Sequence, residues 1–300
     1  MAALLEMTDI SKSFPGVLAL DSVSISVEGG TVHALMGENG AGKSTLMKCL
    51  FGVYEKDTGK ILFNGEEVNF KNSKDALIGG VAMVHQELNQ ALDLSIAENI
   101  WLGRFPKNHK LLPFISEKKM IEKTLEIFRE LDISENPALK VKKLSVSRRQ
   151  MVEIAKAVSY GSKLIVFDEP TSSLSDTEAE KLFEIIAKLK ARGCAIIYIS
   201  HKMEEILRIS DKVSVMRDGK LIATRDAKNI TTDEIIKLMV GRELKERYPE
   251  KQAKPGDILL TVDMLSGIDI PKNASFNLRR GEILGIAGLE GSGKIGRAHV

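Results

Sequence analysis

A nine-residue segment near the N-terminus constrains this chain more than any other feature. It matches the pattern G-x-x-x-x-G-K-[S/T], follows an apolar strand-like run over residues 31–36, and leads into a helix-like run. Glycines let backbone N–H groups turn inward around an anion, and the positive end of the following helix faces the same point. A chance glycine-rich turn would lack this strand and helix. The segment predicts a nucleoside-triphosphate site formed by Gly37, Asn39, Gly40, Ala41, Gly42, Lys43, Ser44 and Thr45.

Acidic and hydroxyl side chains predict the chemistry at this site. Lys43 supplies a full charge for the β- and γ-phosphates, and the Ser44 hydroxyl suits Mg²⁺. An apolar run over residues 163–167 ends in Asp168 and Glu169. Adjacent acids alone are a weak signal, because charged strand ends are common. In a chain with a phosphate loop, they predict that Asp168 holds Mg²⁺ through water and that Glu169 polarises a water for attack on the γ-phosphate.

Two more polar residues directly follow predicted strands. Gln86 comes after the apolar run 81–84, and His201 comes after the run 195–199. A lone glutamine or histidine is usually a surface or core residue. Because open α/β sheets bind ligands at the carboxyl ends of parallel strands, we expect Gln86 to reach the metal and the attacking water, and His201 to reach the γ-phosphate.

The alternation of apolar runs and helical stretches predicts an α/β fold. The runs are short, β-branched and uninterrupted, as expected for strands covered on both faces. We predict a P-loop NTPase core with a mixed, largely parallel sheet and antiparallel β additions, including a hairpin over residues 213–223. Residues 178–192 form an amphipathic helix in this prediction, and residues 91–161 form an inserted helical subdomain without strands.

The chain begins a second copy of itself. Glycines at positions 288, 291 and 293 and Lys294 repeat the glycines and lysine of the first loop at a constant offset. We therefore predict a first nucleotide-binding domain over residues 1–245, a linker over residues 246–257 and a truncated start of a second domain over residues 258–294. The last six residues break the pattern and match a translated sequencing adapter, so we exclude residues 295–300 as an artefact.

Composition excludes several other classes of protein. The 43 basic and 41 acidic residues nearly cancel, which gives no broad basic surface, and we expect no nucleic-acid partner. No run approaches 18 apolar residues, so we expect a protein of the bacterial cytosol that crosses no membrane itself. Cys49 and Cys194 have no metal or redox spacing and are expected to be reduced core residues.

In order and spacing, these motifs resemble those of the ATPase subunits of ATP-binding-cassette (ABC) transporters, over residues 4–294. The resemblance implies that Phe14 stacks on adenine, that Gln86 is a metal-contacting loop glutamine and that His201 is the switch histidine. Residues 144–150, LSVSRRQ, match the family signature LSGGQ only in part, with Val146 and Ser147 in place of two glycines. Since each nucleotide lies between one domain's phosphate loop and the other domain's signature, the resemblance implies one strong and one weak ATP site.

Details such as the segment MVHQELN at residues 83–89 are most similar to the duplicated sugar-importer branch, with galactose/methyl galactoside first and ribose or xylose next. The resemblance implies ATP and Mg²⁺ as cofactors, a place at the cytoplasmic face of the membrane, and permease subunits as partners. An external sugar-binding protein would act indirectly. The alternative class is a soluble duplicated ABC ATPase acting on the ribosome or DNA, which a short linker and the absence of heptads disfavour. A small-molecule kinase would leave His201 and the duplication unexplained.

Overall fold

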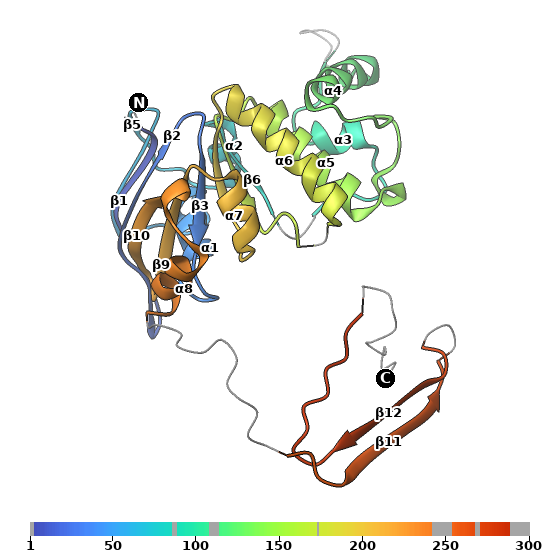
Figure 1. Ribbon diagram of the computed structural model, residues 1–300. Coiled ribbons are helices and arrows are strands. Elements are labelled where there is room, and N and C mark those ends of the chain that lie inside the picture. Colours follow the sequence, from blue (N-terminus) through green and yellow to red (C-terminus); the bar gives the residue numbers. More distant parts are fainter. Residues whose placement is uncertain are drawn as a thin grey trace. The chain divides into compact units, whose positions relative to one another are not determined.

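The computed structural model describes residues 3–85, 89–107, 114–172, 174–241, 254–267 and 271–288. The chain divides into two compact units, Met1–Glu243 and Leu244–Val300, each described here by itself (Figure 1). Most of the predicted linker over residues 246–257 lies outside the described residues, so its bounds stay a prediction. The same holds for residues 295–300.

A six-stranded mixed sheet forms the centre of the first unit. Its strand order is β10–β9–β3–β8–β7–β6, and the five strands from β9 to β6 run parallel, while β10 is antiparallel. This arrangement confirms the predicted α/β fold with a largely parallel sheet. The strands are β3 (Val32–Met36), β6 (Val81–Val84), β7 (Leu164–Asp168), β8 (Ala195–Ile199), β9 (Lys212–Arg217) and β10 (Lys220–Asp226).

A second, antiparallel sheet supplies the predicted β additions. Its order is β2–β1–β4–β5, and β1 and β2 are long strands joined by a tight turn. The strands are β1 (Ala3–Phe14), β2 (Val17–Glu28), β4 (Thr58–Phe63) and β5 (Glu66–Glu67).

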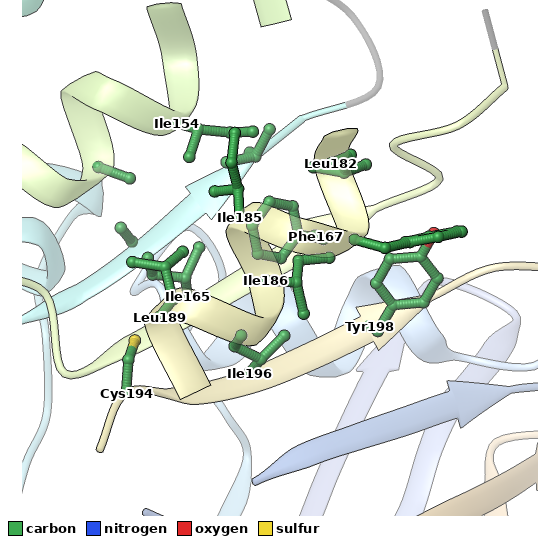
Figure 2. Packing of buried hydrophobic residues seen from close by; sticks show 14 of the residues in the cluster. Ile154, Ile165, Phe167, Leu182, Ile185, Ile186, Leu189, Cys194, Ile196 and Tyr198 are labelled. Atoms are coloured by element: carbon green, nitrogen blue, oxygen red, sulfur yellow. The ribbon is translucent and has the colours of Figure 1, made fainter. Parts of the chain in front are cut away.

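Strand alternation builds a separate apolar core on each face of the central sheet. Along β8, Ile196 and Tyr198 belong to the core that faces the helices α5 (Val146–Ser159) and α6 (Asp176–Ala191). Ile197 and Ile199 belong to the core beneath β1 and β2. Figure 2 shows the first core, where Ile186 of α6 lies over the strands. Both faces of β8 are covered, which is why its sequence is a continuous apolar run rather than an alternating one.

Helices gather on one side of the first unit, at residues 96–159. The helices α3, α4 and α5 contact one another (Figure 1), and the described residues of the span 91–161 contain no strand, only two isolated β-bridges. This confirms the helical character predicted for the span. The elements are α3 (Ile96–Ile100), α4 (Glu117–Leu131), a 3-10 turn (Val141–Lys143) and α5 (Val146–Ser159).

The predicted helix over residues 178–192 begins two residues earlier than expected, as α6 (Asp176–Ala191). The Glu178 carboxylate accepts hydrogen bonds from the Ser175 N–H at 3.0 Å and from the Ser175 hydroxyl at 2.9 Å, which fixes the helix start. The remaining helices are α1 (Lys43–Leu50), α2 (Ser73–Ile78), α7 (Met203–Ile209) and α8 (Thr232–Val240). Among the described residues, every helix is too short or too polar to cross a bilayer.

The second unit contains an antiparallel pair, β11 (Ile258–Leu265) and β12 (Ala274–Arg279). These strands repeat the sequence pattern of β1 and β2. Leu259 is 59% exposed and Ile286 is 62% exposed, because the described part of this unit offers too few elements to cover them.

Candidate nucleotide site

The central sheet brings the predicted site residues to one edge. Leu35 of β3 and Asp168 of β7 both pair in register with Ile199 of β8, so the carboxyl ends of the three strands are level. The phosphate loop follows β3, the acidic pair ends β7, and His201 lies two residues beyond β8. Residues separated by more than 150 positions in the sequence therefore meet at one point, as the ligand-binding rule for open α/β sheets predicts.

Close backbone packing explains two glycines of the loop. A Cβ atom at Gly37 would lie 2.4 Å from the Met216 carbonyl oxygen, and one at Gly42 would lie 2.8 Å from the Ala19 carbonyl oxygen. Gly42 also has φ +101°, in the left-handed region that favours glycine, and it is the N-cap of α1 without a side-chain hydrogen bond to the helix. The first-turn N–H groups of α1 are thus left for an outside acceptor.

A cavity of about 430 Å³ lies in front of this loop. The loop residues that line it are among the site residues named from the sequence, but two further contributions were not predicted. One comes from the first residues of β2, and the other comes from the turn that joins β9 to β10. The lining residues are Val17, Leu18, Ala19, Asn39, Gly40, Ala41, Gly42, Lys43, Ser44, Thr45, Asp218 and Gly219.

The turn at Asp218 and Gly219 is fixed to the loop by backbone hydrogen bonds. The Gly219 N–H donates to the Ala41 carbonyl at 3.2 Å, and the Asp21 N–H donates to the Gly219 carbonyl at 2.9 Å. The Asp-Gly pair indicated a hairpin turn in the sequence. Its place beside the phosphate loop depends on β9 pairing with β3, which no local pattern reveals.

Lys43 is folded across the loop. Its Nζ donates to the carbonyl oxygens of Gly37 at 2.7 Å and Glu38 at 3.0 Å. Burial lowers the pKa of Lys43, and the carboxylates of Glu169 and Asp168 oppose that shift. The ammonium is thus held between the loop and the acidic pair, where it can exchange its carbonyl partners for phosphate oxygens.

Ser44 and Asp168 share a second cavity, of about 400 Å³, which lies between α1 and α5. Burial raises the pKa of Asp168, the neighbouring Glu169 raises it further, and Lys43 counteracts part of the rise. A divalent cation would offset that repulsion. A hydroxyl and a carboxylate on one cavity are hard oxygen donors of the kind that Mg²⁺ prefers, so these residues fit that ion.

Glu169 and His201 are in direct contact. The His201 Nδ1 lies 2.6 Å from the Glu169 Oε2, while the imidazole is 68% exposed and the carboxylate 22% exposed. Glu169 has φ +49°, a left-handed conformation that is uncommon for a residue other than glycine. The structure therefore places the predicted general base and the predicted switch histidine side by side in a strained turn.

Two predicted residues are not placed in the cavity. Phe14 ends β1 and packs edge-on against Tyr54, with ring centroids 5.1 Å apart, and it is absent from the cavity lining, which its neighbours Val17 and Leu18 provide. Gln86 lies outside the described residues. The roles expected of both stay predictions.

The partial signature forms the start of α5. Ser145 is the N-cap, and its hydroxyl accepts from the Arg148 N–H at 3.4 Å. The Ser147 hydroxyl lies 3.0 Å from the Ser145 hydroxyl and also bonds to Glu178, lowering the pKa of that carboxyl. Val146 is 47% exposed. Of the two side chains at the positions of the signature glycines, Ser147 is buried and hydrogen-bonded, whereas Val146 is exposed to solvent.

The model of the ABC transporter family matches residues 20–172 of this chain. That span is half of the chain and contains the phosphate loop, the signature segment and the acidic pair. The chain belongs to the ABC transporter family. Its ABC ATPase domain therefore binds nucleotide.

Curated relatives in the ABC family cover nearly all of the chain. The galactose/methyl galactoside import ATP-binding protein MglA of Clostridium perfringens is 61% identical over 290 residues, which are 96% of this chain and 56% of that protein. The protein of the same name from Fusobacterium nucleatum is 58% identical over 96% of this chain and 58% of its own length. The chain therefore spans little more than half the length of these relatives.

Solved ABC cassettes share the fold. An ATP-binding cassette of an ABC transporter in its ADP conformation superposes with a TM-score of 0.71 at 29% identity, over 81% of this chain and all of that one. A dimeric cassette bound to ADP and phosphate superposes with a TM-score of 0.64 at 19% identity, over 75% of this chain, and supports the fold alone.

Proposed function

We propose that this chain is the ATP-hydrolysing part of a subunit that powers import of a monosaccharide through a membrane permease. The observation that carries the proposal is the meeting of Lys43, Ser44, Asp168, Glu169 and His201 at one edge of the sheet. The relatives named above make galactose or methyl galactoside the best-supported cargo. Ribose and xylose are the next candidates.

Binding of ATP would use the phosphate loop. The free N–H groups at the start of α1 and the Lys43 ammonium are directed to the β- and γ-phosphates. Ser44 and Asp168, with Gln86 as a further proposed ligand, would hold Mg²⁺, which neutralises phosphate charge.

Hydrolysis would use the Glu169–His201 pair. Glu169 accepts the proton of the attacking water, and His201 holds Glu169 in place and donates to the γ-phosphate once that group is present. In the family, each such site is closed by the signature of another cassette. We propose that the chain's second cassette supplies the signature for this site.

The proposed partners follow from import. We infer permease subunits in the membrane, an external sugar-binding protein that acts through them, and a position of this chain at the cytoplasmic face. The ribosomal alternative receives no support from these relatives, whose names refer to import.

Glu169→Gln tests the assignment of the general base. The substitution keeps the size of the side chain but removes the charge that polarises water, so turnover should fall at least ~10²-fold. ATP hydrolysis and ATP affinity are measured on the chain joined to the second half of the Clostridium perfringens relative. Affinity should be unchanged.

Glu126→Gln is the matched control, because Glu126 is an exposed residue of α4 away from the site. Its turnover should equal that of the parent. Turnover of Glu169→Gln within a few-fold of the control would refute the assignment. Failure of the parent to restore galactose uptake in a strain lacking its own importer ATPase would refute the choice of sugar.

A further inference from the structure

A carboxylate near the Glu169–His201 pair accepts hydrogen bonds from two separate segments of the chain. Glu205 of α7 accepts from the Thr171 hydroxyl at 2.8 Å and from the Tyr198 hydroxyl at 2.9 Å through the same oxygen. The Ser200 hydroxyl lies 3.5 Å from that oxygen. Thr171 and Ser200 are buried, Tyr198 is fully buried, and the Glu205 side chain is 12% exposed. A buried carboxylate with this many hydrogen-bond donors is held in one position.

Lys202 completes this cluster. Its Nζ lies 3.1 Å from the other Glu205 oxygen and donates to the Thr171 carbonyl at 3.2 Å. Its backbone N–H donates to the Ser200 hydroxyl at 3.0 Å. Burial raises the pKa of Tyr198, and the Glu205 carboxylate raises it further, so this hydroxyl stays protonated and remains a donor.

The segments joined by Glu205 are the two that carry the proposed catalytic pair. Thr171 lies two residues after Glu169, and Ser200 and Lys202 flank His201. The main chain already joins these segments at one point, where the Glu169 N–H donates to the Ile199 carbonyl at 2.9 Å. Glu205 adds a second link between these segments, through its hydrogen bonds to the Thr171 and Tyr198 hydroxyls.

The left-handed backbone of Glu169 shows why a second link matters. A non-glycine residue at φ +49° is strained and persists only when its surroundings determine the conformation. The Ser172 N–H closes this turn on the Glu169 carbonyl at 3.2 Å, and Thr171 lies inside the same turn. Release of Thr171 from Glu205 would let the turn relax and the carboxylate move.

We propose that Glu205 is a positioning residue that holds Glu169 and His201 in their mutual geometry by tying residues 169–171 to residues 200–202. The inference rests on the proposed function, because it concerns the geometry of the proposed catalytic pair. Glu205 is not among the residues that line the two cavities beside the phosphate loop. Its effect on hydrolysis passes through the two loops.

The test compares Glu205→Ala and Glu205→Gln with Glu204→Gln, an exposed neighbour in the first turn of α7. ATP turnover and ATP affinity are measured on the chain joined to the second half of the Clostridium perfringens relative. We expect Glu205→Ala to lower kcat at least ~10-fold with an ATP affinity within about threefold of the parent, since the phosphate loop is untouched. Glu205→Gln keeps an acceptor oxygen and should recover part of the loss, and Glu204→Gln should match the parent.

A double-variant cycle separates positioning from general stability. In a His201→Ala background the pair no longer exists, so Glu205→Ala should lower turnover by less than about threefold. An equal loss in both backgrounds, an equal fall in affinity and kcat, or unchanged turnover of Glu205→Ala would each overturn the inference. If Glu205→Ala fails to fold, Thr171→Val and Tyr198→Phe each remove one bond to the same oxygen, and unchanged turnover in both would overturn it equally.

Glu169→Gln in the same series keeps the two proposals apart. Loss of turnover in Glu169→Gln with normal turnover in Glu205→Ala refutes the positioning role alone. Normal turnover in Glu169→Gln, or no turnover in the parent, refutes the proposed function on which that role depends.

Discussion

The helices α1 and α5 both begin at segments that the ABC family uses around ATP, but their first turns are built in opposite ways. At α1 the N-cap is Gly42, which offers the helix no side-chain hydrogen bond. At α5 the N-cap is Ser145, whose hydroxyl accepts from Arg148 and also contacts the Ser147 hydroxyl. The start of α1 has no side-chain cap, whereas at the start of α5 a side chain accepts from one of the first-turn N–H groups.

This difference determines which helix start can bind an anion. An open first turn with a nearby ammonium, as in α1 with Lys43, gains hydrogen bonds when a phosphate arrives. A first turn already capped by Ser145, with an exposed Val146 beside it, has less to gain. This difference supports the prediction that the partial signature of this cassette serves a weak ATP site, which stays a prediction.

The largest effect is expected when the ammonium group at the start of α1 is removed. Lys43→Ala should lower ATP affinity at least ~10²-fold, because a charge-assisted hydrogen bond contributes roughly 1.5–3 kcal/mol and Lys43 can form one to each of two phosphates. Arg148→Ala is the matched control in the first turn of α5. Titration with a fluorescent ATP analogue should show no loss for Arg148→Ala, and equal losses would remove the distinction between the two helices.

Acid should destabilise the fold through His33, which lies in β3, the strand directly before the phosphate loop. Burial lowers the pKa of His33 to about 4 from 6.5, and its Nε2 lies 2.7 Å from the Ser214 hydroxyl. Between those values the unfolded chain binds a proton that the folded chain does not. Stability is therefore lost as the pH falls from about 6.5 to 4, by up to about 3 kcal/mol.

Denaturant unfolding at several pH values measures this loss. His33→Gln should flatten the dependence in that window. Val146→Ala, at the start of α5, should leave the slope unchanged because this exposed aliphatic side chain neither titrates nor bonds to a titrating group. A slope unaffected by His33→Gln would show that another group is responsible.

The smallest effect is expected when the N-cap residues of α1 and α5 are exchanged, as Gly42→Ser and Ser145→Gly. Gly42→Ser introduces a preferred N-cap residue, yet it should lower the free energy of unfolding by about 1–3 kcal/mol, because its Cβ would lie 2.8 Å from the Ala19 carbonyl and φ is +101°. Ser145→Gly should cost only a few tenths of a kcal/mol. Thermal unfolding of both variants decides this, and a stabilised Gly42→Ser would contradict the structure.

The sequence was most informative where a local pattern sufficed. The buried strands β6 and β8 have the bounds expected from their apolar runs, and the loop from Asn39 to Thr45 lines the cavity as predicted. The place of the Asp218 turn beside the phosphate loop, and the cluster at Glu205, could not be predicted, because they depend on strand pairing and on side-chain packing over long separations. Glu205 in the sequence is one acid among several on a polar helix face.

The site at Phe14 shows the other limit. The resemblance to ABC ATPases assigns this ring to adenine, and that role stays a prediction. In the structure the ring packs on Tyr54, and Val17 and Leu18 line the cavity instead. An aromatic ring near a phosphate loop can pack against another aromatic side chain or against adenine, and the sequence does not reveal which contact it makes.

The strand order has a consequence for synthesis of the chain. The strand β3, which carries the phosphate loop, ends at Met36, but its neighbours β8 and β9 begin at Ala195 and Lys212. At ~5–20 residues per second, both edges of this apolar strand stay unpaired for roughly 10–30 s after it emerges from the ribosome. In ribosome-bound chains that end before residue 195, both edges of β3 are therefore open to pairing with other chains, and the sheet that carries the phosphate loop cannot form until β8 has been made.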